Sequence, residues 1–305
     1  MNILEINGLS KSFGSKEVLS GLNMTVAQNS VFGFVGQNGA GKTTTMKIIL
    51  GLLKADGGCI TVCGEKVSYG DTKTNRHIGF LPDVPEFYGY MRPMEYLKLC
   101  GEITGLSKEQ IHSKSKELLD LVGLGNENKK ISSFSRGMKQ RLGIAQALLN
   151  EPKLLICDEP TSALDPIGRR QILDILLAIK GKTTVVFSTH ILSDVESICD
   201  YVAFLHDGKI ALQGSLSEVR KKYRSRGYNI MFENEDQLNI FINTIELEDH
   251  DIDLVKNKNQ VTVGFNDPKE DGSFLIDLLA NKKIVPLRFE KIEPSLENLF
   301  REVVK

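Results

Sequence analysis

A glycine-rich segment that ends in lysine and threonine is the strongest chemical pattern in the chain. It fits G-x-x-x-x-G-K-[ST] from Gly36 to Thr43, after an apolar stretch that predicts a buried strand and before a predicted helix. Glycines let the backbone wrap closely around phosphates, and N–H groups at a helix start present partial positive charge to them. Lys42 adds a full charge, and the Thr43 hydroxyl is placed to bind Mg²⁺. The candidate phosphate-binding residues are Gly36, Gln37, Asn38, Gly39, Ala40, Gly41, Lys42, Thr43 and Thr44.

Two adjacent carboxylates follow a second apolar stretch. Leu154–Cys157 predicts a buried strand, and Asp158 and Glu159 come directly after it. Ligands of such sheets bind at the carboxyl ends of the strands, so Asp158 can hold Mg²⁺ and Glu159 can orient or deprotonate an attacking water. Alone, this pair is equally consistent with an acidic helix start. The phosphate loop upstream favours the catalytic interpretation.

Strands and helices alternate around these residues. Apolar stretches predict strands at 30–35, 153–157 and 183–188, and the patterns at 42–53 and 166–179 predict helices. Such alternation implies an α/β fold with a mostly parallel sheet wrapped by helices.

Two regions depart from this alternation. Residues 84–150 contain several helical patterns and few strand signals, which predicts a helical insertion within a first domain at 1–215. Beyond it, strand patterns at 227–234, 260–265 and 284–290 and helix patterns at 237–245, 273–281 and 295–304 predict a small C-terminal α+β domain at 216–305. The basic stretch at 220–226 is a candidate linker, although a solvated helix end explains it more simply.

Composition limits the possible partners. The chain has 305 residues, of which 41% are hydrophobic and 25% charged, and its net charge of -1 argues against nucleic acid as main partner. No stretch approaches the ~20 apolar residues of a membrane-spanning helix, and the start lacks a signal-peptide pattern. We therefore expect a cytosolic chain that reaches a membrane only through a partner. The five scattered cysteines argue against a disulfide framework, and Cys59 and Cys63 lack the second half of a zinc site.

Three further motifs follow a pattern that is found in one protein family. Ser135–Arg141 precedes a predicted helix at 142–149, Thr161–Asp165 follows the acidic pair, and His190 ends the third predicted strand. These elements, in this order over residues 1–215, resemble the ATP-binding cassette (ABC) family. The resemblance implies a P-loop cassette with a parallel-sheet core, an antiparallel β subdomain and the helical insertion.

The resemblance also assigns roles to single residues. It implies ATP and Mg²⁺ as cofactors, with Lys42, Glu159 and His190 as catalytic residues and Phe13 stacked on adenine. Ser135, Gly137 and Met138 would contact the nucleotide, and the metal ligands would be Thr43, Asp158 and Asp83. Three residues depart from the family pattern: Arg136 replaces the first glycine of the signature L-S-G-G-Q, Met138 replaces its glutamine, and Asp83 replaces a glutamine.

The same resemblance implies partners. The signature of one cassette closes on ATP held by a second, so we expect a dimer, most simply of two identical chains. A separately encoded membrane permease would dock in a groove lined by residues 83–99 and hold the chain at the inner face of the membrane. The signature and the tail at 293–300 resemble the exporter branch. The alternatives are a soluble ABC ATPase of translation or DNA repair, and a regulatory subunit that hydrolyses ATP poorly; a single cassette without a coiled-coil insertion disfavours the first, and the intact catalytic residues disfavour the second.

Overall fold

The chain divides into two compact units. The computed structural model describes residues 1–71, 73–222, 227–245, 252–265, 272–292 and 296–303. The first unit comprises Met1–Val219 together with Phe300–Lys305, and the second comprises Arg220–Leu299. Part of the basic stretch at 220–226 and part of the tail at 293–300 lie outside the described residues.

A six-stranded sheet forms the centre of the first unit, in the order β10-β9-β3-β8-β7-β6. Its strands are β3 (Val31–Gly36), β6 (Ile78–Leu81), β7 (Leu154–Cys157), β8 (Thr184–Thr189), β9 (Tyr201–His206) and β10 (Lys209–Ser215). The five strands from β6 to β9 pair in parallel, and only β10 runs antiparallel to its neighbour. Every residue of β3, β7 and β8 is buried, as expected for strands covered on both faces. The predicted parallel core is confirmed.

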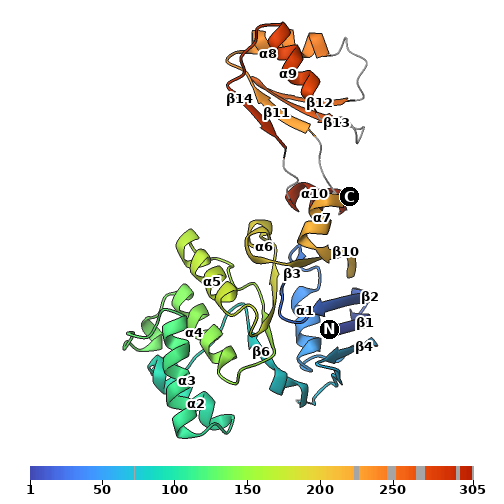
Figure 1. The fold of residues 1–305 in the computed structure, drawn as a ribbon. Coiled ribbons are helices and arrows are strands. Elements are labelled where there is room, and N and C mark those ends of the chain that lie inside the picture. The colour runs from blue at the N-terminus through green and yellow to red at the C-terminus, as the bar shows by residue number, and fades with distance from the viewer. Residues whose placement is uncertain (72, 223–226, 246–251, 266–271, 293–295, 304–305) are drawn as a thin grey trace. The chain divides into compact units, whose positions relative to one another are not determined.

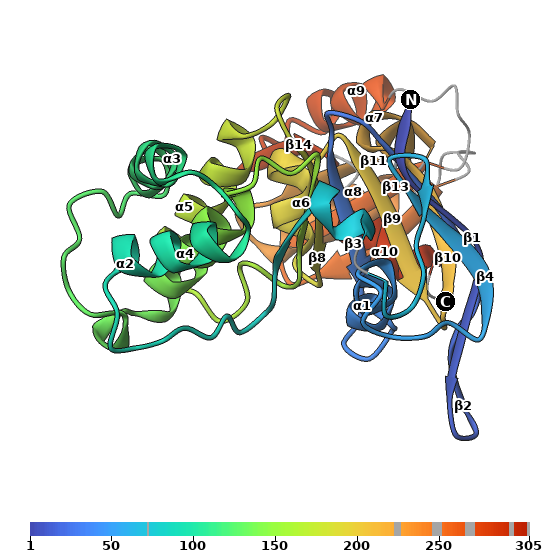
Figure 2. The same cartoon turned by 90° about the horizontal axis from the view of Figure 1, so that it is seen from below.

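An antiparallel sheet packs beside this core (Figure 2). It has the order β2-β1-β4-β5, with β1 (Asn2–Phe13), β2 (Lys16–Ala27), β4 (Gly57–Val62) and β5 (Glu65–Lys66). Its apolar face shares one cluster of buried side chains with β3 and with the helix after it, including Leu4, Ile6, Phe34 and Met46. This common core fixes the loop between β3 and that helix against a rigid support.

The helices α1 (Lys42–Ile49), α5 (Pro166–Ala178) and α6 (Leu192–Ile198) of the first unit accompany the sheets, and α7 (Leu216–Lys222) begins in this unit and continues past its boundary at Val219. The predicted helix at 42–53 ends early, at Ile49, because Leu50 is its C-cap and Gly51 follows with a φ of 69°. Short 3₁₀ turns lie at Lys73–His77 and Ile131–Ser133.

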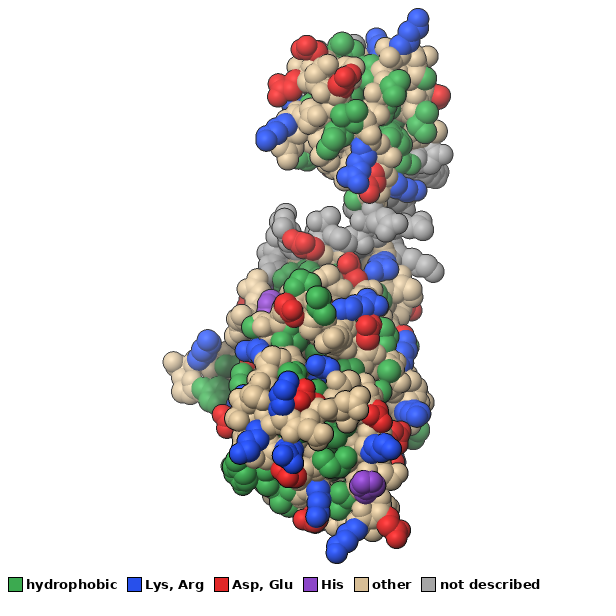
Figure 3. Space-filling view, turned by 90° about the vertical axis from the view of Figure 1, so that its left-hand side faces the viewer, with side chains coloured by type: hydrophobic (Ala, Val, Ile, Leu, Met, Phe, Trp, Pro, Cys, Tyr) green, Lys and Arg blue, Asp and Glu red, His purple; other side chains and the backbone are tan. Residues whose placement is uncertain are grey.

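The helical insertion consists of α2 (Pro93–Ile103), α3 (Lys108–Leu121) and α4 (Arg136–Leu148) (Figure 1). The helix predicted at 142–149 starts earlier, at Arg136, because the Ser135 hydroxyl accepts a hydrogen bond from the Met138 N–H and caps it. Figure 3 looks onto the side of the first unit that carries these helices, and side chains of both charges are mixed with apolar ones there.

In its described residues, the second unit contains a four-stranded antiparallel sheet accompanied by the helices α8 and α9. Its elements follow the order β11 (Gly227–Met231), α8 (Glu235–Ile245), β12 (Ile252–Asn257), β13 (Gln260–Phe265), α9 (Ser273–Asn281) and β14 (Arg288–Lys291). The strand order β12-β13-β11-β14 makes this the split β-α-β arrangement of ferredoxin-like domains. Its own core contains Ile230, Phe232, Phe241, Val263 and Leu275. A last helix, α10, spans Leu296–Val303.

Among the residues that the structure describes, no helix is both long and apolar enough to cross a membrane.

Candidate active site

The glycine-rich segment forms a tight loop from the end of β3 to the start of α1. Gly41 is the N-cap of α1 with a φ of 111°, and a Cβ there would lie 2.7 Å from a methyl of Leu19. Only glycine fits such a backbone in so close a contact. The loop and α1 therefore present main-chain N–H groups and the Lys42 side chain to one small hollow.

This hollow has a volume of about 350 Å³. It is lined by Asn38, Gly39, Gly41, Lys42, Thr43, Thr44, Asp83, Glu159, Ser162 and His190. The residues come from the segments that follow β3, β6, β7 and β8, which are neighbouring or near-neighbouring strands of the parallel part of the sheet. The candidate residues of the phosphate loop and the acidic strand thus meet in space. Phe13, Ser135, Gly137 and Met138 are not among the described residues that line the hollow.

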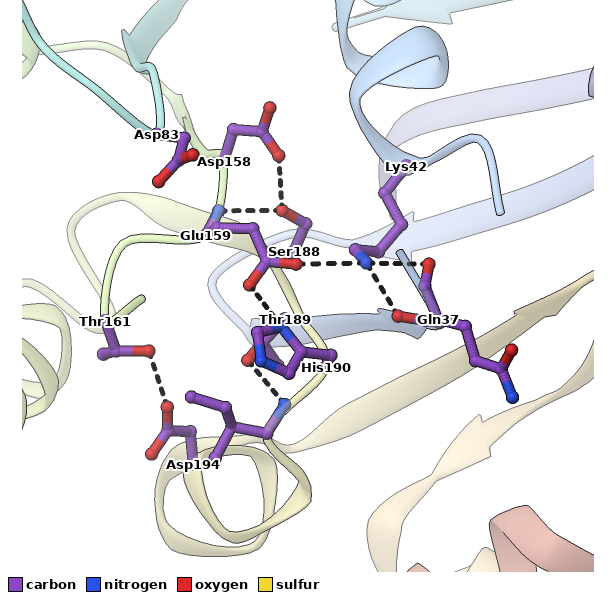
Figure 4. Close-up of polar contacts among 12 residues, drawn as sticks. Gln37, Lys42, Asp83, Asp158, Glu159, Thr161, Ser188, Thr189, His190 and Asp194 are labelled. Carbon is purple, nitrogen blue, oxygen red and sulfur yellow. Dashed lines mark hydrogen bonds and ion pairs between the residues drawn. The ribbon is translucent and has the colours of Figure 1, made fainter. Parts of the chain in front are cut away.

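Lys42 is the buried cation of the site (Figure 4). Its Nζ donates to the Gly36 carbonyl at 2.7 Å and to the Gln37 carbonyl at 3.2 Å. It also pairs with Glu159 Oε1 at 3.0 Å, and the two side chains are 5% and 13% exposed. A phosphate that reaches Lys42 must therefore compete with the Glu159 carboxylate for it.

Glu159 is held in place from three sides. Its backbone has a φ of 47°, in the left-handed region that non-glycine residues seldom adopt. The Glu159 N–H donates to the Ser188 hydroxyl at 2.9 Å, and its Oε2 lies 2.9 Å from His190 Nδ1 (Figure 4). The carboxylate therefore bridges an ammonium and an imidazole at the edge of the hollow, where a base or water-orienting group would act.

Asp158 lies deeper, with 4% of its surface exposed. The Thr43 hydroxyl donates to its Oδ2 at 2.7 Å, and the Ser188 hydroxyl donates to its Oδ1 at 2.7 Å. Hydroxyl and carboxylate oxygens are the hard donors that Mg²⁺ prefers, and Mg²⁺ is usually held by one or two carboxylates plus substrate phosphates. The pair of Thr43 and Asp158 fits that chemistry. No group of three or more His, Cys, Asp or Glu side chains suited to a metal occurs among the described residues.

Asp83 lies at the same hollow, but its carboxylate is paired with Arg136 Nη2 at 3.0 Å. The Gln140 side-chain amide also donates to its main-chain carbonyl. Phe13 lies at the end of β1 with 50% of its surface exposed, and the Lys11 ammonium is 5.4 Å from the centre of its ring. The ring therefore presents an open face near the cassette surface.

Sequence reasoning missed several residues that position the site. Ser188 fixes both Asp158 and the Glu159 backbone, and it was one undistinguished residue of a predicted strand. The buried Asp194 accepts from the Thr161 hydroxyl at 2.7 Å and from Arg169 at 2.6 Å, which ties the segment after Glu159 to α6. The signal for Ser188 was its place near the carboxyl end of a central strand; Asp194 had no local signal.

A glycine-rich loop between a parallel strand and a helix, facing two carboxylates at the end of another strand, defines a P-loop nucleoside triphosphatase. Comparison with known proteins gives the family. The ABC transporter family model matches residues 19–162, and the model "ATP-binding protein DrrA1-3-like, C-terminal domain" matches residues 214–304.

Individual proteins that resemble the chain belong to the same family. The uncharacterised ABC transporter ATP-binding protein YxlF of Bacillus subtilis is 37% identical over 304 residues, which is 99% of each chain. The bacitracin transport ATP-binding protein BcrA of Bacillus licheniformis is 40% identical over 225 residues, 73% of this chain and 72% of that one. A solved "ATP binding subunit of ABC transporter" has a TM-score of 0.65 and 32% identity, covering 72% of this chain and 93% of its own. The chain belongs to the ATP-binding subunits of ABC transporters, which are ATPases coupled to transport. These relatives disfavour the translation and DNA-repair alternative.

Proposed function

We propose that this subunit powers export through a separately encoded permease, and that its cargo is a peptide antibiotic or a similar amphiphile. The observation that carries this proposal is the 40% identity with BcrA, whose name states bacitracin transport. The resemblance of Ser135–Arg141 to the exporter branch supports the direction. Two identical chains at the inner face of the membrane would form the motor.

The proposed chemistry is hydrolysis of Mg²⁺-ATP at the hollow. The N–H groups of the phosphate loop and Lys42 bind the β- and γ-phosphates, while Thr43 and Asp158 would hold Mg²⁺, which offsets phosphate charge. Glu159 orients a water for attack on the γ-phosphorus; the bond from that phosphorus to the β–γ bridging oxygen breaks, ADP leaves, and the protons of the water leave with the inorganic phosphate. His190, 2.9 Å from Glu159, supports the carboxylate, and because it lines the hollow it would face the γ-phosphate. Phe13 stacks on adenine.

The proposed dimer follows from the position of α4. Its N-terminus, at Ser135, Arg136 and Gly137, presents N–H groups that suit an anion, whereas the Met138 N–H is bonded to the Ser135 hydroxyl. Ser135, Gly137 and Met138 do not line the hollow of their own chain. A second copy can bring them onto the nucleotide. ATP would then lie between two chains, and its hydrolysis would release them.

We also propose where the permease docks. A second hollow of about 710 Å³ lies between β6 and the ends of α2 and α4, and Phe80, Thr104 and Gln146 contribute to its lining. Beside it, the Tyr96 hydroxyl donates to Gln146 at 3.0 Å, and the Tyr96 ring contacts the 55% exposed Tyr88. Burial raises the pKa of the Tyr96 hydroxyl. None of residues 83–99, the groove that the sequence predicts for docking, lines this hollow, and of the two rings only Tyr88 is exposed. We propose that an amphipathic helix of the permease occupies the hollow and extends over Tyr88.

The experiment is co-expression of the chain, in a bacitracin-sensitive bacterium, with a candidate permease chosen because a neighbouring gene encodes several membrane-spanning segments. We expect resistance to bacitracin that disappears with Glu159→Gln and persists with Glu109→Gln, an exposed carboxylate on α3. Resistance that Glu159→Gln leaves intact would contradict an ATP-driven exporter. Residues 216–305 are proposed as an accessory domain, and removing them tests whether resistance needs them.

A further inference from the structure

Two side chains of α4, the helix that carries the signature motif, contact Asp83. Arg136 Nη2 lies 3.0 Å from Asp83 Oδ1, and the Gln140 side-chain amide donates to the Asp83 carbonyl. Arg136 and Gln140 lie one helical turn apart, on the same face of α4. Two of the chain's departures from the family pattern, Asp83 and Arg136, therefore contact each other within one chain.

The ion pair between Arg136 and Asp83 adds little to the stability of the folded chain. The Arg136 and Asp83 side chains are 41% and 46% exposed, and pairs at such exposure contribute little to folding. The anchor is Gln140, which is fully buried and fixes the Asp83 backbone. With the backbone fixed, the arginine decides where the Asp83 carboxylate points and how much of its charge the hollow experiences.

That charge matters because the hollow is already acidic. Glu159 lines it beside Asp83, Asp158 lies behind Thr43, and Lys42 is the buried cation that offsets them. An unpaired Asp83 would add a negative charge where a triphosphate must enter. It would repel ATP without metal and attract a divalent cation. Pairing with Arg136 suppresses both effects.

We propose that Arg136 is a positioning residue that holds the Asp83 carboxylate away from the nucleotide until a divalent cation competes for it. Loading of Mg²⁺-ATP then frees the guanidinium at the N-terminus of α4. Arg136 thereby sets the preference of the hollow between metal-bound and metal-free ATP, and it links the metal end of one site to the signature motif of the same chain. The inference rests on the proposed binding of Mg²⁺-ATP at this hollow.

The test measures the affinity of the full chain for a fluorescent, non-hydrolysable ATP analogue, once with excess Mg²⁺ and once with EDTA. The protein is kept at low concentration. For Arg136→Ala we expect metal-free affinity to fall about fivefold, the scale of one charge partly screened by water. Affinity with Mg²⁺ should stay equal or rise, so the Mg²⁺ dependence of binding increases. Arg136→Lys should retain most of the wild-type dependence, because it keeps the charge.

Together with the wild type and Arg136→Ala, the variants Asp83→Asn and Asp83→Asn/Arg136→Ala form a double-mutant cycle. If Arg136 acts through Asp83, removing the arginine from the Asp83→Asn chain leaves the Mg²⁺ dependence unchanged within about twofold. Lys116→Ala, which removes an exposed cation of α3, controls for net charge. Circular dichroism checks that each variant is folded.

The possible results distinguish a failure of the proposed nucleotide site from a failure of the proposed role of Arg136. A wild-type chain that binds no nucleotide refutes the site itself. A chain that binds nucleotide, but in which Arg136→Ala changes both affinities by the same factor, overturns the positioning role alone. An effect of Arg136→Ala that is equally large in the wild-type chain and in the Asp83→Asn chain also overturns it.

Discussion

Replacing Glu159 by glutamine separates nucleotide binding from turnover. Glutamine keeps the size of the side chain but removes the charge that pairs with Lys42 at 3.0 Å and with His190 at 2.9 Å. Lys42 no longer has a competing carboxylate, so its ammonium is fully available to phosphate. The hydrogen bond from the residue 159 N–H to Ser188 is a main-chain contact and survives.

The two effects differ in sign and size. Freeing a largely buried lysine from its partner is worth roughly 1 kcal/mol after desolvation is subtracted, or about a fivefold gain in ATP affinity. Loss of the group that orients the attacking water costs on the order of 10²–10⁴ in rate. The variant should thus bind ATP as well as or better than the wild type and turn it over at least about 100 times more slowly.

Phosphate release in the presence of the permease measures turnover, and equilibrium dialysis with ATP measures affinity. Glu109→Gln is the matched control, since the exposed Glu109 lies on α3 away from the hollow. Turnover within about threefold of wild type would refute the role of Glu159, and so would a large loss of affinity with turnover intact.

Three further predictions test other parts of the site. Lys42→Ala removes a cation with two carbonyl contacts and leaves the Glu159 carboxylate with His190 but without its ammonium partner, so ATP affinity should fall about 30-fold or more by dialysis; unchanged affinity would contradict the phosphate role. Phe13→Ala should weaken ATP binding about 5- to 30-fold and leave inorganic triphosphate binding unaltered in calorimetry, because only the base stacks; equal losses would exclude stacking. Burial raises the pKa of the Cys157 thiol, so a thiol reagent at about pH 8 should modify the exposed Cys59 and reach Cys157 only on unfolding; rapid labelling of Cys157 in the folded chain would show that the strand opens.

The parts of the site that the sequence predicts are those encoded in contiguous residues. The phosphate loop is a single segment whose glycines and lysine have fixed positions, and Asp158 and Glu159 follow a strand recognisable by its apolar run. Their convergence could be predicted because parallel strands end at a common edge.

Contacts between distant segments could not be predicted in this way. Asp83 and Arg136 each appeared as a separate departure from the family pattern, and only the packing of α4 against the loop after β6 shows that they pair. The early start of α4 was missed because Gly137 weakens the helical pattern, whereas the Ser135 cap compensates for it. In the second unit, β12 was missed since most of its residues are polar or exposed, as edge strands often are.

In the proposed dimer, ATP is held by the amides and lysine of one chain and covered by α4 of another. Sedimentation velocity of the Glu159→Gln chain, with and without Mg²⁺-ATP, tests it most directly. We expect a monomer without nucleotide, a dimer at millimolar Mg²⁺-ATP, and loss of that dimer when Ser135→Arg is added. A monomer at every ATP concentration, or a dimer indifferent to Ser135→Arg, would contradict it.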